Sequence, residues 1–229
     1  MLFHIRSSFA KFADAHPVGF CKQPDNLVTR VAFAAPGKAV PLTVLNLAAA
    51  TKTEDQGASP KCAAYSCSSF AENILWRRTG RIPSDIDPSS LYNRAKQLDG
   101  DPRGDGTTLT AVLQALLDQK IFAADRCAVR TILSTFDVKA AIHRYGACLL
   151  GLNISEEWYK GRTYITETSS KLVGGHAVLC TGYDSDGCWI QNSWGQNWGS
   201  QGFARIAWPA FNRQFMYGGI LRGCLNDLD

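Results

Sequence analysis

The apolar positions in the first half of the chain recur at helical spacing. In "CAAYSCSSFAENILWRRTG", which begins at Cys62, they return every three or four residues, and Gly80 follows the last of them. "YNRAKQL" predicts a further short turn of helix, and "DVKAAIHRYGA" predicts a helix with Asp137 as its N-cap. "TTLTAVLQALLDQK" predicts an amphipathic helix whose apolar face carries Leu109, Val112, Leu113, Leu116 and Leu117.

From about residue 147 the pattern changes to short continuous or alternating apolar runs. "ACLLGLNI", "HAVLCTGYD", "CWIQNSW", "FARIAW" and "GGILRG" are bounded by Gly, Asp and Asn, which is typical of strands. Helices followed by strands predict an α+β chain with two segregated lobes. We expect an N-terminal extension over residues 1–40 and one domain over 41–229. Its helical lobe would span about 56–146, and its β lobe about 147–229 with a strand near 41–50.

Composition and charge narrow the class of protein. The chain has 229 residues, of which 45% are hydrophobic and 19% charged, as expected for an ordinary globular core. The formal charge of +4 is small and scattered along the chain, so nucleic acid is not an expected partner. The one dense basic segment, "WRRTGR", is interpreted as a solvated helix end. No apolar run is long enough to cross a membrane, and the N-terminus does not resemble a secretory signal. We therefore expect a cytoplasmic protein, or one exported without a cleavable signal peptide.

The cysteines and histidines do not form an ordinary zinc motif. The eight cysteines include no C-x-x-C pair, and the chain has only four histidines, so no metal and no cofactor are expected. Cys148 and Cys180 lie within apolar runs and are expected to be buried core residues. Most of the cysteines are predicted to be free thiols.

Four residues together suggest nucleophilic catalysis. Cys62 opens a predicted helix, where free N–H groups and the helix dipole favour a thiolate. Gln56 precedes it by six residues and could supply an oxyanion donor beside the Cys62 N–H. His176 opens a strand, and Asn192 lies at the end of the next one. A hairpin would bring these two side by side, so that Asn192 orients His176 as a base for Cys62.

Each of these residues also has a structural explanation when taken alone. A cysteine at a helix start is often structural, a lone histidine is often a satisfied core residue, and an Asn before Gly often caps a turn. The combination in the order Gln, Cys, His, Asn favours the catalytic interpretation. The remaining histidines, His4, His16 and His143, have no comparable setting in the sequence.

The sequence resembles the papain-like cysteine peptidases, and more closely their compact bacterial branch. The resemblance covers roughly residues 40–229 and rests on "DQG", "CAAYS", "DGTTLTAVLQAL", "GGHAVLCTGYD" and above all "IQNSWGQNWGSQGFARI". It implies a two-lobed papain-like fold, with a helical lobe carrying the Cys and a β-barrel-like lobe carrying the His and Asn. It also implies that Trp194 shields the bond between His176 and Asn192, and that substrate contacts Pro60, Lys61, Gly175 and Trp194.

The chain departs from that family's pattern around the nucleophile. Pro60 and Lys61 stand where Gly-Ser is usual, Ala63 replaces an aromatic residue, and Ser59 replaces a cysteine that secreted members use in a disulfide. The resemblance implies a monomeric thiol peptidase that hydrolyses peptide bonds in protein or peptide substrates. Two alternatives stay open: an acyl-transfer or amide-hydrolase enzyme on the same residues, and a catalytically silent peptide-binding module.

Overall fold

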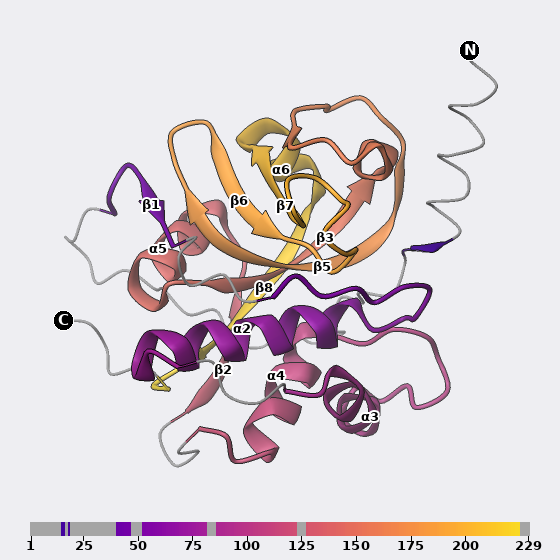
Figure 1. Ribbon diagram of the computed structural model, residues 1–229, viewed down its shortest axis with the longest axis vertical. Helices are drawn as coiled ribbons and strands as arrows, with labels where there is room; N and C mark the ends of the chain where they lie inside the picture. The colour runs from indigo at the N-terminus through magenta and orange to yellow at the C-terminus, as the bar shows by residue number, and fades with distance from the viewer. Residues whose placement is uncertain are drawn as a thin grey trace.

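The protein is described here by a computed structural model (Figure 1). The structure describes Ala15, His16, Val18 and residues 40–46, 52–81, 86–122 and 127–224. Most of the expected N-terminal extension, Cys21, and positions 47–50 of the expected strand near 41–50 lie outside these residues. None of the described helices is long and apolar enough to cross a membrane.

Three helices form the first lobe, as the helical spacing predicted. They are α2 (Cys62–Thr79), α3 (Pro88–Leu98) and α4 (Leu109–Asp118). Asp87 caps α3 through the N–H groups of Ser89 and Ser90, and Thr108 caps α4 through the N–H of Ala111. Gly80 ends α2 in the left-handed conformation, which a residue without a Cβ adopts readily. The predicted apolar face of α4 is buried: Leu109, Val112, Leu113, Leu116 and Leu117.

The second lobe is built on a curved sheet. Seven of its strands follow in the order β2-β8-β3-β5-β6-β7-β4, and β1 pairs with β5 off this path. All pairs are antiparallel except β4 with β7. The strands are β1 (Val44–Leu45), β2 (Ala128–Ile132), β3 (Cys148–Ser155), β4 (Tyr164–Ile165), β5 (Leu172–Tyr183), β6 (Gly187–Gln191), β7 (Phe203–Ala207) and β8 (Phe215–Arg222).

Three further short or medium helices accompany the sheet. They are α5 (Thr135–Tyr145), the 3₁₀ helix η2 (Glu156–Lys160) and α6 (Trp208–Gln214). The N-cap expected for α5 is wrong. The helix begins one turn earlier than expected, and the hydroxyl of Ser134 accepts the N–H of Asp137 at 3.1 Å. Asp137 therefore lies in the first turn, where its negative charge suits the helix dipole.

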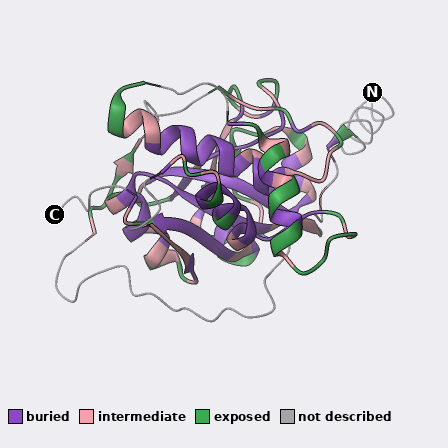
Figure 2. Cartoon of the chain, turned by 90° about the horizontal axis from the view of Figure 1, so that it is seen from below, coloured by how far each residue is buried: buried purple, intermediate pink, exposed green. Residues whose placement is uncertain are grey.

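The lobes meet where α2 packs against β5. Figure 1 shows α2 lying directly beneath the sheet, and Figure 2 shows it buried along most of its length, with its C-terminal end exposed. Ser66 fixes this contact, because its buried hydroxyl donates to the carbonyl of Ala177 on β5 at 2.9 Å. The start of α2 and the middle of β5 are thereby held together.

Most of the described cysteines are free thiols, as expected, but one pair that the sequence did not indicate is bonded. Cys127 and Cys224 form a disulfide, whereas five other described cysteines are buried free thiols: Cys62, Cys67, Cys148, Cys180 and Cys188. Cys127 directly precedes β2 and Cys224 follows β8, and these two strands pair with each other. The sequence could not reveal this pairing, because it depends on which strands are neighbours in the sheet.

We predict that removing this disulfide weakens the fold. The two cysteines are 97 residues apart, and closing a loop of that size restricts the unfolded chain, so Cys127→Ser should lower the free energy of unfolding by about 2–5 kcal/mol. Urea unfolding with and without reductant measures this. The double variant Cys127→Ser/Cys224→Ser is the control and should not respond to reductant. A wild-type protein that is equally stable when reduced would contradict the prediction.

Candidate active site

Cys62 is the first residue of α2 and is completely buried. The preceding residue, Lys61, makes no side-chain capping bond, while its carbonyl accepts the N–H groups of Ala64 and Tyr65. The N–H groups of Cys62 and Ala63 thus have no partner within the helix and point beyond its N-terminus. This end of α2 can stabilise a negative charge on sulfur or on a nearby oxygen.

His176 and Asn192 lie side by side, as the hairpin argument predicted. His176 is in β5, Asn192 follows β6, and the two strands are paired. His176 Nε2 and Asn192 Oδ1 are 2.7 Å apart in a buried environment. Asn192 Oδ1 also accepts the N–H of Ser193 at 2.9 Å, so it acts as an acceptor and Nε2 must be the donor. The neutral ring then carries its proton on Nε2 and an open lone pair on Nδ1.

His176 Nδ1 is the available basic atom of this pair. It is buried and makes no hydrogen bond with any of the described residues. Cys62 lies nearby, because the backbone N–H of Ala177, the residue after His176, interacts with the Cys62 sulfur as a hydrogen-bond donor and lowers the pKa of the thiol. The docking of Ser66 onto Ala177 holds the two segments in this relation. The arrangement allows a proton to pass from the thiol to Nδ1 after a small adjustment.

Aromatic rings enclose the bond between His176 and Asn192. The Trp194 ring lies 4.7 Å from the His176 ring, and Trp158 meets His176 edge-on at 6.1 Å. Tyr159 stacks on Trp194 at 5.4 Å with nearly parallel planes. Only 1% of Trp194 is exposed. Water is therefore kept from the His176–Asn192 bond, which strengthens it.

Gln56 is held at the same site by its amide group. Its Oε1 accepts the hydroxyl of Ser193 at 2.7 Å, and its Nε2 donates to the carbonyl of Ser59 at 3.0 Å. These two contacts fix which end of the amide is nitrogen. One N–H of Gln56 is left over, since a primary amide has two. Ser193 was not identified as a site residue from the sequence, although it lies in the Asn-Ser-Trp motif.

The electrostatics of this buried centre disfavour charge on either partner. Burial raises the pKa of the Cys62 thiol to about 11. The backbone N–H groups of Ala177, Ala63 and Cys62 lower this pKa, but their effect is smaller than that of burial. Burial lowers the pKa of His176 to about 4. The hydrogen bond to Asn192 raises this pKa by a smaller amount, and the nearby His16 lowers it further. The thiol and imidazole are therefore both neutral at pH 7 in this arrangement.

His16 lies at the site, contrary to the sequence-based expectation that it has no such setting. Its ring is 5.8 Å from Trp194, and its Nε2 is 3.2 Å from Asp55 Oδ1. Asp55 directly precedes Gln56 and forms a bridge with Trp194. No local pattern reveals this contact, because His16 lies about forty residues before Asp55 in the sequence.

The residues expected to contact substrate are arranged around Cys62 and His176. Pro60 and Lys61 are half-buried directly before Cys62, and Gly175 is half-buried directly before His176. The ammonium group of Lys61 donates to Ser89 Oγ at 3.0 Å and lies 5.8 Å from the Tyr92 ring centre. Within the described part of the chain, no group of three His, Cys, Asp or Glu residues could hold a metal ion.

Part of the chain is similar in sequence to known proteins. A family model described as papain family cysteine protease matches residues 117–214. Cathepsin B-like cysteine proteinase 3 of Caenorhabditis elegans is 34% identical over 92 residues, which are 38% of this chain and 25% of that protein. Cathepsin J of Rattus norvegicus is 37% identical over 76 residues, 30% of this chain and 23% of that protein. The matches thus span about a quarter of the length of these relatives.

Two solved structures show the same fold over most of their length. Xylellain, a cysteine protease from Xylella fastidiosa, has a TM-score of 0.68 at 16% identity, covering 90% of this chain and 97% of that one. ProCathepsin B S9 from Trypanosoma congolense has a TM-score of 0.71 at 14% identity, covering 91% and 87%. The fold is therefore papain-like, α+β, as expected. The match to the family model covers the stretch from residue 117 to 214, and the solved structures extend the likeness in fold to about nine tenths of the chain.

We predict that His176 makes the protein sensitive to acid. In the unfolded chain it binds a proton near its ordinary pKa of 6.5, but in the fold only near 4. The unfolded state therefore takes up more protons as pH falls through this window, and stability should drop by about 3 kcal/mol between pH 7 and pH 4.

Urea unfolding of wild type and His176→Gln at the two pH values isolates this contribution from other titrating groups. The variant should lose distinctly less stability than the wild type over the same interval. An equal loss in both proteins would mean that His176 does not titrate in the way described.

Proposed function

We propose that the protein is a thiol peptidase that hydrolyses peptide bonds through Cys62 and His176. The proposal rests mainly on His176 Nδ1, which is buried and has no hydrogen-bond partner among the described residues. Asn192 orients its ring, and the ring lies next to the helix end that bears Cys62. A base with an open lone pair beside a thiol is the arrangement that nucleophilic catalysis requires. The relatives named as cysteine proteinases and cathepsins support the same activity.

In the proposed reaction His176 Nδ1 takes the proton from Cys62, and the sulfur attacks the carbonyl carbon of the substrate. The carbonyl oxygen becomes an oxyanion, which accepts the N–H of Cys62 and the remaining N–H of Gln56. His176 then gives the proton to the departing amine, leaving a thioester on Cys62. Water, deprotonated by His176, attacks the thioester and releases the acid, and the proton returns to the thiol.

The neighbouring residues support this chemistry in defined ways. Ser193 keeps the amide of Gln56 in the orientation that presents nitrogen, and Asn192 keeps the Nε2 proton of His176 in place. Pro60 and Lys61 are proposed to contact the substrate residue before the cleaved bond. Gly175 and Trp194 are proposed to contact substrate beside His176. No cofactor is needed, and the enzyme is proposed to act as a monomer.

A second candidate function is a silent peptide-binding module. The observation that favours it is the complete burial of Cys62 and His176, together with pKa values that keep both neutral. A substrate reaches these groups only when the residues that cover them move. An acyl-transfer enzyme on the same residues differs only in the final acceptor, and added amines would then trap the thioester.

The disulfide between Cys127 and Cys224 indicates in which cellular compartment the protein would act. Of the two locations expected, cytoplasm or export without a cleavable signal, the Cys127–Cys224 bond favours export, since such bonds persist in oxidising surroundings.

We predict unequal losses from substitutions at the site. With a peptide selected from a cleavage library, Cys62→Ala and His176→Ala should abolish turnover. Gln56→Ala should lower kcat about 10²–10³-fold, the effect of losing one oxyanion donor. Asn192→Ala should lose less than either of the first two, because it only orients His176.

Cys67→Ala provides a matched control, since Cys67 lies in the same helix and is also a buried thiol. It should keep its activity. Brief alkylation with limiting iodoacetamide followed by peptide mapping should modify Cys62 before the other cysteines. A folded wild type that cleaves no library peptide would favour the silent module, and activity that survives Cys62→Ala would exclude the proposed mechanism.

A further inference from the structure

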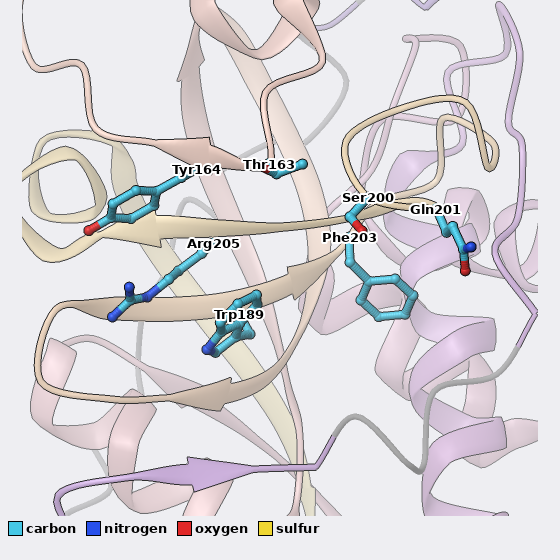
Figure 3. A pocket seen from close by; sticks show the side chains of 7 residues that line it. All are labelled: Thr163, Tyr164, Trp189, Ser200, Gln201, Phe203 and Arg205. Atoms are coloured by element: carbon cyan, nitrogen blue, oxygen red, sulfur yellow. The ribbon is translucent and has the colours of Figure 1, made fainter.

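A cavity of about 600 Å³ lies on the β lobe apart from the residues discussed so far. Figure 3 shows its side chains on the adjacent strands β6, β7 and β4 and on the turn before β7. Trp189 and Tyr164 are both register partners of Arg205, so the three side chains form a row across the strands. The alternation of β6 and β7 buries Cys188, Ile190, Ala204 and Ile206, which leaves this row on the outer face.

The walls of the cavity are aromatic and carry little net charge. Arg205 lies 5.0 Å from the Tyr164 ring centre and 5.8 Å from that of Trp189. Its guanidinium binds the carboxylates of Asp184 and Asp186, so its charge is already compensated. An anionic ligand would gain little from a cation that is already paired with two carboxylates. The cavity therefore suits a neutral, apolar side chain.

Polar groups at the rim are free to bind a peptide backbone. The side chains of Thr163, Ser200 and Gln201 make no hydrogen bond among the described residues, and all three line the cavity. A peptide offers carbonyl oxygens to such donors together with a side chain for the aromatic walls.

Two segments connect this cavity with the candidate active site. One runs from Trp194 to Ser200 and Gln201, and it returns to the site through the bond from Asn192 N–H to the Gly202 carbonyl at 2.8 Å. The other runs from Tyr159, which stacks on Trp194, to Thr163 four residues later. An extended chain covers at most about 14 Å in four residues. The cavity lining at Thr163 therefore begins within about 14 Å of Tyr159, whose ring stacks on Trp194 beside His176.

The chemistry of the proposed reaction tells which part of the substrate would reach it. His176 protonates the departing amine, so the portion after the cleaved bond leaves on the side of His176 and Trp194. Both cavity-forming segments begin on this side.

We propose that the cavity is an extended substrate site that binds a neutral aromatic or large aliphatic residue about four positions after the cleaved bond. The inference rests on the proposed peptidase function and assigns it a substrate class: extended polypeptides rather than short peptides. Burial of one large apolar side chain against these rings is expected to change the affinity about tenfold.

The test compares two fluorogenic peptides that share a library-selected cleavage sequence. The short one ends two residues after the cleaved bond, and the long one continues for four neutral residues with Phe at the fourth position after the bond. The expected result is a long-to-short ratio of kcat/KM that falls about tenfold in Trp189→Ala and Tyr164→Ala, mainly through KM. A long peptide with Gly in place of Phe should show the same fall with the wild type.

Phe136→Ala is the matched control, because Phe136 is a largely exposed aromatic residue of α5 that does not line the cavity. It should keep the wild-type ratio. A ratio that is unchanged in Trp189→Ala and Tyr164→Ala while both peptides are cleaved would overturn the cavity assignment but not the peptidase function.

Binding to inactive Cys62→Ala separates the two proposals further. The long peptide should bind about tenfold more tightly than the short one by isothermal titration calorimetry, and this difference should vanish when Trp189→Ala is added. If neither peptide is cleaved by the wild type but this difference is found, the peptidase function fails while the peptide site stands. Equal binding of both peptides, or saturable binding of a neutral oligosaccharide alone, would overturn the site.

Discussion

The seating of the α2 N-terminus against β5 is the contact on which the candidate site depends. It brings a helix end with free N–H groups to a strand that carries a histidine, and neither element could provide the chemistry alone. The bond from Ser66 to the Ala177 carbonyl sits one turn after Cys62 and one residue after His176. Any shift between the lobes would therefore change the distance from thiol to base directly.

The same contact explains why the centre is dry. Cys62, His176 and Trp194 are buried because the lobes close around them, and burial penalises the charged forms of both thiol and imidazole. The protein counters this with fixed dipoles: the amides at the start of α2, the side chain of Asn192 and the oriented amide of Gln56. These groups need no rearrangement to stabilise charge that develops during a reaction. The electrostatic stabilisation that these dipoles provide increases as water is excluded, so the burial of the centre and the placement of the dipoles reinforce each other.

The sequence predicted features that depend on neighbours along the chain or on simple strand pairing. The helical face of α4, the end of α2 at Gly80, and the juxtaposition of His176 with Asn192 all follow from local spacing. Contacts between remote segments were not accessible in this way. The reach of His16 to Trp194 and the pairing of Cys127 with Cys224 depend on the three-dimensional path of the chain. Ser134 was missed as the cap of α5 because both Ser134 and Asp137 are good capping residues.

The position of the disulfide has a topological consequence. Cys127 and Cys224 bracket α5, α6 and every strand of the sheet except β1, so that this stretch of chain forms one covalent ring. A single backbone cut anywhere within the ring opens it but leaves both pieces attached through the sulfur atoms. A lobe nicked by a protease would thus still migrate as one molecule until a reducing agent released the fragments.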